Sequence, residues 1–292
     1  MSVFNKRHGT FNPACWGAAV AAMIAAVCAG ALFLYLVLQS VPIFRDQGWS
    51  FLSGRDWRVG ETYGALPMIY GSLMATGLAL ALALPFALGS AVVAAEFLPA
   101  RARLMVKAAM ELLAGVPGII YGLLGVSILT GLVKDVFGLI DGNTLLAAGV
   151  LLGIMILPTI MTLAEDAMRA VPGEYRDAAL SLGLTRVQTA FGVTARMALP
   201  GIAGAVFLGL GRAMGETVAV MLVIGGLDRI PQPWHNIFAP AQSIPSKLGR
   251  EAAEAMGAGL HWNALVGLGL VLFLMAMAVT LAGNLFLRRV RL

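Results

Sequence analysis

Charged side chains are scarce in this chain. Aspartate, glutamate, lysine and arginine make up 12% of its 292 residues and hydrophobic residues make up 59%, whereas ordinary globular chains contain about 25% and 45–50%. The mean hydropathy is +0.86. This shortage of charge excludes an ordinary soluble domain and indicates an integral membrane protein in a lipid bilayer. The basic residues gather at the ends of apolar runs, so the pI near 9.6 reflects membrane topology and we expect no nucleic-acid partner.

Cysteine and histidine are also rare. Cys15 and Cys28 both lie in or beside the first apolar run. On a helix they would be about 20 Å apart, whereas a disulfide needs Cα atoms within about 7 Å. His8, His235 and His261 are scattered, and neither an HExxH nor a CxxC motif is present. We therefore predict no disulfide framework, no metal site and no catalytic residues, as in a protein that is not an enzyme.

Long apolar runs dominate what remains. About 20 residues cross the hydrocarbon core of a bilayer, and six runs are long enough to do so. The first run is longer than the apolar core of a cleaved signal peptide, so we expect it to stay as an anchor. We predict an all-α, polytopic fold with a tail at 1–14 and one transmembrane domain at 15–292. The predicted spans are about 15–38, 68–95, 107–132, 144–164, 198–227 and 262–287.

The basic residues are unevenly divided between the two sides of these spans. Twelve lysines and arginines lie in four segments: the N-terminal tail, the loop after the second span, the segment 165–197 and the C-terminus. The segments on the opposite side carry 7. Cytoplasmic loops carry the excess of basic residues. We therefore expect both termini and the segment 165–197 to lie in the cytoplasm.

The segment 165–197 is charged and helix-forming, although short loops usually join neighbouring spans. Pro172 is well placed at a helix start, and a helix can run from Glu174 to Leu182. Gly183 suits the left-handed stop that follows, and Thr185 can cap a second short helix that ends near Val193. This pattern predicts a compact cytoplasmic protrusion that contacts another protein.

One face of the first predicted helix carries small side chains. Ala178, Ala179 and Leu182 would let a partner approach closely, because bulkier side chains would hold it away. Glu174 and Tyr175 flank this face and are candidate partner contacts. Three nearby arginines are expected to be solvated or to contact lipid head groups: Arg169, Arg176 and Arg186.

The motif Asp177-Ala178-Ala179-x-x-x-Gly183 resembles the EAA loop of ABC importer permeases. In that family the loop forms coupling helices that seat in a groove on a cytoplasmic ATPase, so the resemblance implies ATPase contact by Glu174, Tyr175, Asp177, Ala178, Ala179 and Gly183. Two positions depart from the family pattern. Asp177 stands for the usual glutamate, and the later Leu-Pro is absent at 195–196 but occurs at Leu199-Pro200.

Four further stretches resemble phosphate permeases of the PstC type, and the likeness covers about residues 40–292. These stretches are Tyr63–Leu73, Gly115–Gly122, Glu165–Pro172 and Gly209–Thr217. The resemblance implies a MetI-like architecture in a bacterial or archaeal inner membrane. It also implies a second permease subunit of the PstA type, two ATPase subunits of the PstB type and a periplasmic phosphate-binding protein of the PstS type.

Arg212 and Glu216 lie near the middle of the fifth predicted span. A charge at the bilayer centre costs upward of about 2.5 kcal/mol, so such residues usually face a bundle interior or a watery path. Their i,i+4 spacing puts them on one helix face, where they can pair. One interpretation is a substrate gate, because the guanidinium fork matches a tetrahedral oxyanion. The other is a structural ion pair that locks helices or subunits together.

The chain has no GxxxxGK[ST] motif for cradling ATP phosphates. We therefore expect no cofactor on this chain and ATP with Mg²⁺ on a partner ATPase. The predicted function is the permease subunit of an ATP-driven phosphate importer, forming half of the translocation pathway. The alternatives are a permease for another oxyanion, or a secondary anion transporter. The latter would have a pair of corresponding broken helices in the two halves of the chain, which is not evident in the sequence, and it would have no docking loop.

Overall fold

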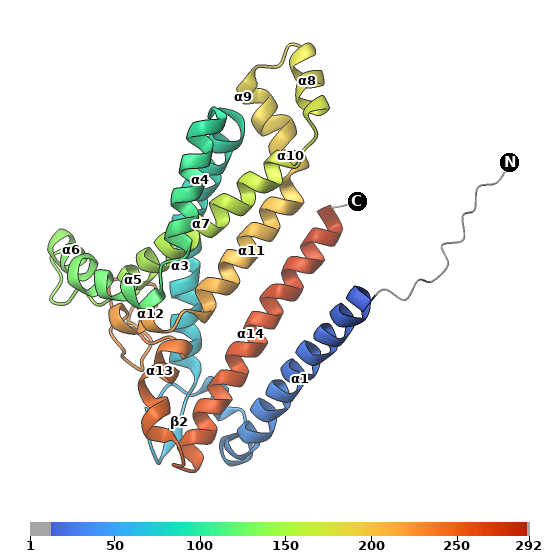
Figure 1. Ribbon diagram of the computed structural model, residues 1–292. Coiled ribbons are helices and arrows are strands. Elements are labelled where there is room, and N and C mark those ends of the chain that lie inside the picture. Colours follow the sequence, from blue (N-terminus) through green and yellow to red (C-terminus); the bar gives the residue numbers. More distant parts are fainter. Residues whose placement is uncertain (1–12, 291–292) are drawn as a thin grey trace.

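The computed structural model describes residues 13–290, so most of the predicted tail at 1–14 lies outside the described residues. Within that range the fold is helical, and Figure 1 shows long helices running roughly along one another. Five helical stretches are long and apolar enough to cross a membrane: Gly17–Gln47, Leu66–Glu96, Gly118–Phe137, Leu145–Arg169 and Leu260–Arg288. A sixth span is formed if Arg186–Met197 and Leu199–Gly215, bent by 71°, count as one. The predicted all-α membrane fold is confirmed.

The elements follow one another in a simple order. Up to the middle of the chain they are α1 (Pro13–Gln47), α2 (Ser50–Ser53), β1 (Trp57–Arg58), β2 (Thr62–Tyr63), α3 (Leu66–Glu96), α4 (Ala100–Ala114), α5 (Gly118–Leu124), the π-helical turn η1 (Gly125–Leu129) and α6 (Thr130–Phe137). Then come α7 (Leu145–Arg169), α8 (Gly173–Ser181), α9 (Arg186–Thr189), the π-helical turn η2 (Ala190–Thr194), α10 (Ala195–Met197), α11 (Leu199–Gly215), α12 (Val218–Val223), α13 (Ile244–Ala255) and α14 (Leu260–Val290). The two strands pair antiparallel, with Trp57 opposite Tyr63.

The core lies where α3 packs against α7. Small side chains make this close approach possible, as they do between membrane helices in general. A Cβ atom on Gly149 would lie 2.6 Å from Cβ of Leu78, so that position has room for glycine alone. On the other side of α7, a Cβ on Gly209 of α11 would lie 2.6 Å from Cγ1 of Ile160. Alanines at every fourth position of α3 are buried in the same core: Ala75, Ala79, Ala83, Ala87 and Ala91.

Helices α1 and α14 run side by side at the edge of the molecule (Figure 1). The most apolar stretch of α1 has no buried residue in this chain. Large apolar side chains such as Met23 and Val27 are therefore free to face lipid or another subunit.

The predicted third span at 107–132 is wrong at its start. Residues 107–114 belong to α4, none of whose residues is buried, and the chain breaks after it. Pro117 has φ −58° and ψ 139°, and the helix begins again at Gly118. Proline has no N–H to continue a helical hydrogen-bond ladder, which explains the restart at this point. The apolar span is Gly118–Phe137.

Two other predicted boundaries differ from the structure. The fourth span does not end at 164, because α7 continues as helix to Arg169 and takes Glu165 out of the predicted loop. The fifth predicted span, 198–227, is interrupted, since α11 ends at Gly215 and α12 begins at Val218. The first difference changes the surroundings of Glu165, and the second changes those of Arg212 and Glu216.

Candidate functional site

The predicted protrusion is present between α7 and α11, at the end of the molecule where Figure 1 labels α8 and α9. Gly183 has φ +85°, the left-handed stop that the sequence predicts. Thr185 caps α9 through a capping box with Gln188. The second helix does not end near Val193, however. It continues through η2 and α10 to Met197, and the chain then bends by 71° into α11.

Arg176 joins the protrusion to the membrane helices. Its Nε donates to Oε1 of Glu96 at 3.0 Å, at the last residue of α3. Its two terminal nitrogens donate to the carbonyl oxygens of Val171 at 2.7 Å and Met168 at 2.8 Å. The interpretation of Arg176 as a solvated or lipid-contacting residue is therefore wrong. Glu96 lies 80 positions before Arg176, so no local pattern in the sequence predicts this ion pair.

Ala179 does not lie on an exposed partner-facing surface. It is 5% exposed, whereas Ala178 is exposed and Leu182 is 82% exposed. Adjacent residues on a helix point about 100° apart, so Ala178 and Ala179 cannot serve the same face. Ala179 lies on the inner side of α8, which packs against η2. The remaining predicted coupling residues lie on the outer part of the protrusion and are exposed: Glu174, Tyr175, Asp177 and Gly183.

Glu165 is a buried charge that the sequence interpretation missed. Its side chain is 2% exposed and is surrounded by the guanidinium of Arg103 at 3.8 Å, the ammonium of Lys107 at 3.5 Å and the guanidinium of Arg169 at 3.7 Å. Lys107 also pairs with Asp166. The carboxylate thus joins α4 to the end of α7. Two local patterns in the sequence favour this cluster: the i,i+4 ion pair Glu165 and Arg169 on α7, and the i,i+4 spacing of Arg103 and Lys107 on α4.

Arg212 lies at the end of α11 and reaches two other elements. Its Nη1 donates to Oγ1 of Thr159 in α7 at 3.0 Å, and its Nη2 donates to the carbonyl oxygen of Ala114 at 2.9 Å. Ala114 is the last residue of α4. Arg212 also lines a cavity of about 550 Å³, whose other polar lining residues include Thr280 and Asn284 of α14. Its guanidinium fork is therefore held by neutral acceptors beside an open space.

Glu216 forms no ion pair with Arg212 in the described part of the chain, so the predicted pairing is wrong. An i,i+4 pair needs a continuous helix, but Glu216 has φ −71° and ψ 119° and ends α11. Its Oε1 accepts from the backbone N–H of Ala219 at 3.2 Å, in the first turn of α12. A Cβ on Gly118 would lie 2.6 Å from the same oxygen, so Glu216 also lies against the start of α5.

Two interrupted helices therefore meet at this site. Arg212 holds the carbonyl group just before the 115–117 break, and Glu216 contacts Gly118 just after it. The helices that follow the two breaks also touch, because a Cβ on Gly122 would lie 3.0 Å from Cα of Ala219. Two helix breaks, at 115–117 and after Gly215, thus lie together, whereas the sequence predicted a continuous span across each. Broken helices expose backbone groups that can line a substrate site near the middle of a membrane.

The architecture and the interrupted helices are those of a membrane transport subunit. The chain belongs to the family of binding-protein-dependent transport system inner membrane components, whose model matches residues 83–292. It is 35% identical to the phosphate transport system permease protein PstC of Mesorhizobium japonicum, over 92% of this chain and 88% of that protein. It is also 35% identical to the PstC protein of Pasteurella multocida, over 89% of each chain. The predicted resemblance to PstC-type permeases is confirmed.

A solved structure of the MetNI methionine ABC transporter, in an inward-facing conformation, has a similar fold. The TM-score is 0.58 at 19% sequence identity, over 76% of this chain and 94% of that one. At this identity the similarity concerns the fold alone, and it confirms the predicted MetI-like architecture.

Proposed function

We propose that this chain is the permease subunit of an ATP-driven phosphate importer, in which it forms half of the translocation pathway. The observation that carries the proposal is the position of Arg212 where two interrupted helices meet. The similarity to PstC proteins along about nine-tenths of the chain supports phosphate as the substrate. A permease for another oxyanion is the second candidate, because a guanidinium fork suits any tetrahedral oxyanion.

Arg212 and Glu216 divide the handling of the anion between them. The donors of Arg212 are occupied by the neutral oxygens of Thr159 and Ala114. A phosphate dianion can displace them because an anionic, bidentate acceptor binds the guanidinium fork more strongly than two neutral oxygens do. Glu216 lies on the far side of the 115–117 break and repels the same anion. That repulsion keeps binding weak enough for release. A purely structural role for Arg212, tying α11 to α4 and α7, is the alternative interpretation.

The protrusion couples the pathway to the ATPase. Its exposed residues, among them Tyr175, Asp177 and Leu182, form the contact surface, while Ala179 holds α8 on η2 from the inside. Arg176 transmits a displacement of α8 to the end of α7. Helix α7 is also the helix that carries Thr159, the partner of Arg212. The force and the substrate thus act on one continuous helix.

The complete importer contains further chains. We propose a second permease subunit of the PstA type, two ATPase subunits of the PstB type that bind ATP with Mg²⁺, and a periplasmic phosphate-binding protein of the PstS type. Both termini and the protrusion lie in the cytoplasm. The excess of basic residues on that side supports this orientation.

Uptake by the reconstituted complex tests the substrate. Proteoliposomes would contain this chain with the second permease, the ATPase and the binding protein, and radiolabelled phosphate uptake would be measured with and without ATP. We expect ATP-dependent uptake that excess unlabelled phosphate abolishes and excess tungstate or phosphonate does not. ATP-dependent uptake of another oxyanion alone would support the second candidate. Uptake driven by an ion gradient without ATP would identify a secondary transporter.

Cross-linking tests the ATPase contact. A cysteine introduced by Leu182→Cys lies at the exposed C-terminal end of α8 and should cross-link to the ATPase. The matched control Ala179→Cys lies within α8 and is buried, so it should not cross-link. Absence of any cross-link from Leu182→Cys, Tyr175→Cys and Ala178→Cys would contradict the coupling role.

A further inference from the structure

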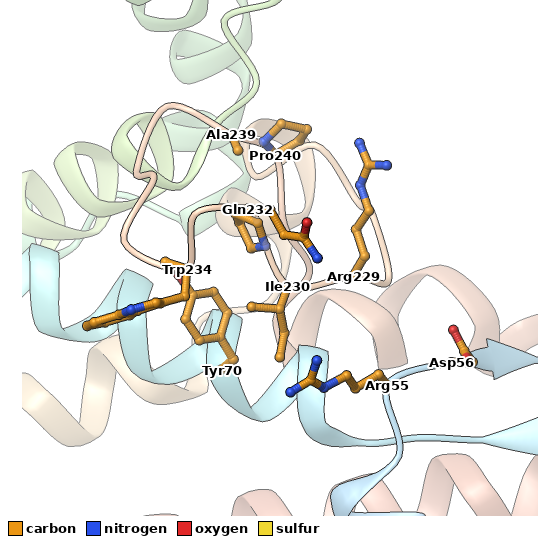
Figure 2. A pocket seen from close by; sticks show the side chains of 10 residues that line it. Arg55, Asp56, Tyr70, Arg229, Ile230, Gln232, Trp234, Ala239 and Pro240 are labelled. Atoms are coloured by element: carbon orange, nitrogen blue, oxygen red, sulfur yellow. Dashed lines mark hydrogen bonds between the residues drawn. The ribbon is translucent and has the colours of Figure 1, made fainter.

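A second, larger cavity lies away from Arg212, beside the first turns of α3. Its volume is about 970 Å³. Figure 2 shows the side chains that enclose it. They come from three segments: the residues just before β1, the start of α3, and the long connection between α12 and α13. The lining residues that matter here are Arg55, Asp56, Tyr70, Arg229, Gln232 and Trp234.

The lining of this outer cavity is basic. Arg55 and Arg229 come from separate segments, and neither forms a salt bridge in the described part of the chain. Asp56 is the one carboxylate among the lining residues, so the formal charge of the lining is positive. In the view of Figure 2, the Gln232 amide lies beside the Arg229 side chain, and Arg55 lies below them. A concave site of one charge sign raises the local concentration of ions of the opposite sign.

The wall of the cavity is held in place before any ligand arrives. The hydroxyl of Tyr70 donates to the carbonyl oxygen of Trp234. Two backbone hydrogen bonds join the ends of the α12–α13 connection. The N–H of Ala241 donates to the carbonyl oxygen of Ile224 at 3.0 Å, and the N–H of Gly226 donates to the carbonyl oxygen of Ala241 at 2.9 Å. Groups that are already ordered lose less entropy when they bind a ligand.

A small closed space beside Glu216 lies near the outer cavity. Pro240 lines the outer cavity, and Ser243, three residues further along the chain, lines a space of only about 10 Å³ together with Ser72 and Glu216. The closure is tight: the N–H of Ile244 donates to Oγ of Ser72 at 2.8 Å, and a Cβ on Gly71 would lie 2.0 Å from the carbonyl oxygen of Gln242. The basic outer cavity and the small space beside Glu216 are thus neighbours, separated by the constriction where α3 contacts residues 242–244.

We propose that the outer cavity is an anion-binding entry site, in which Arg55 and Arg229 hold a phosphate-group oxyanion before the constriction at Ser72 opens. This proposal rests on the proposed function, because it assigns the same substrate class to a second position on the path. Arg55 and Arg229 both lie in segments that the distribution of basic residues puts on the outer side.

Thiol modification of the assembled importer tests this site without requiring transport. In a Cys15→Ser, Cys28→Ser background, Gln232→Cys puts a thiol in the cavity wall. Its reaction rates with a negatively charged and a positively charged methanethiosulfonate reagent would be compared, with and without inorganic phosphate. The test variants add Arg55→Gln with Arg229→Gln. The matched control is Arg45→Gln, an exposed arginine at the same end of the molecule that does not line the cavity.

We expect the negative reagent to react faster than the positive one, and the double arginine variant to lower that ratio by about tenfold. We expect inorganic phosphate to slow the reaction, and this protection to be lost in the double variant and kept in Arg45→Gln. A reaction ratio that does not change when both arginines are replaced would overturn the proposal. So would protection by the binding protein but not by free phosphate, because that result would make the cavity a protein contact.

Two further experiments complete the test. One distinguishes free phosphate from a lipid head group, and the other distinguishes failure of the outer site from failure of the proposed function. Nanodiscs of phosphatidylcholine and of phosphatidylglycerol distinguish free phosphate from a lipid head group: protection that appears only with phosphatidylglycerol would contradict an entry site for substrate. Phosphate uptake would be measured on the same preparations. Normal uptake without phosphate protection would refute the outer site alone, whereas phosphate protection without any phosphate uptake would refute the proposed function alone.

Discussion

The guanidinium of Arg176 in α8 and the carboxylate of Glu96 at the end of α3 form an ion pair at 3.0 Å. The pair joins the protrusion to a helix residue that precedes Arg176 by 80 positions. The same guanidinium holds two carbonyl groups at the end of α7. Helix α8 is therefore attached to both helices of the core, in addition to its covalent connection.

We expect Arg176→Lys to uncouple ATP hydrolysis from transport. Lysine lacks the planar fork that contacts Glu96, Val171 and Met168 together. Hydrogen bonds to charged groups contribute about 1.5–3 kcal/mol, so the phosphate transported per ATP should fall about tenfold while ATPase activity remains. The matched control is Arg186→Lys, at an exposed position of α9. An unchanged transport-to-hydrolysis ratio in Arg176→Lys would contradict this role.

Arg212→Lys should abolish most phosphate flux in an assembled complex that still hydrolyses ATP. A lysine ammonium is a point charge and lacks the planar fork that contacts Thr159 and Ala114 and then the oxyanion that displaces them. Uptake and ATPase activity in the same proteoliposomes measure the effect, and the exposed Arg101→Lys serves as the control. If Arg212→Lys instead lowers assembly or thermal stability and leaves flux per complex normal, the residue is structural.

Glu216→Gln separates the charge of Glu216 from its hydrogen bond. The amide oxygen of glutamine can still accept from Ala219, so α12 should keep its first turn. Without the carboxylate charge the anion should leave more slowly, and the turnover rate of uptake should fall while the thermal midpoint stays within a few degrees, as for surface substitutions of about 0.5 kcal/mol. Normal turnover in this variant would show that the charge has no part in release.

Glu165→Gln should destabilise the protein far more than Asp166→Asn, its immediate neighbour. The first change leaves three cations near one another around a buried neutral side chain. It should lower the free energy of unfolding by about 3 kcal/mol. The second removes a pair whose aspartate side chain is 53% exposed and should cost less than about 1 kcal/mol. Reversible unfolding in mixed micelles measures both. Equal losses in the two variants would contradict the buried position of Glu165.

Asp228, in the connection after α12, should make stability depend on pH. Burial raises the pKa of Asp228 above its ordinary value of 3.8, and the hydrogen bond from Lys247 opposes this shift only in part. The folded state therefore binds the proton more tightly, and this contribution to stability is lost as the pH rises from 3.8 through the folded-state pKa. The unfolding free energy of Asp228→Asn minus that of the unchanged protein should rise between pH 4 and pH 7. A difference that is constant across this range would argue against the raised pKa.

Local patterns in the sequence were sufficient for several parts of the protrusion. A left-handed stop needs glycine for steric reasons, and Gly183 adopts it. Thr185 and Gln188 are three residues apart, and they form the cap and the reciprocal bond. The side that Ala179 faces was not predictable in this way, because it depends on where η2 lies.

The interruptions at 115–117 and after Gly215 mark the limit of such patterns. An apolar run of 30 residues with two internal charges predicts one continuous span, yet the backbone leaves the helix at Glu216. The reason is tertiary: Glu216 fills the space over Gly118 and holds the N–H of Ala219, while Arg212 reaches to Ala114 and Thr159. Each of those contacts, except the one to Ala219, joins elements far apart in the chain.

By itself the sequence determined that this chain lies in a membrane, that it is helical and that it carries a polar protrusion, because hydrophobicity, periodicity and turn chemistry are local properties. Its motifs also indicated the permease family. The tertiary structure alone decided which charges meet. It placed Arg176 on Glu96, buried Glu165 among three cations and separated Glu216 from Arg212. Electrostatic partners are chosen by distance in space, and for these residues the packing of α3, α4, α7 and α11 sets that distance.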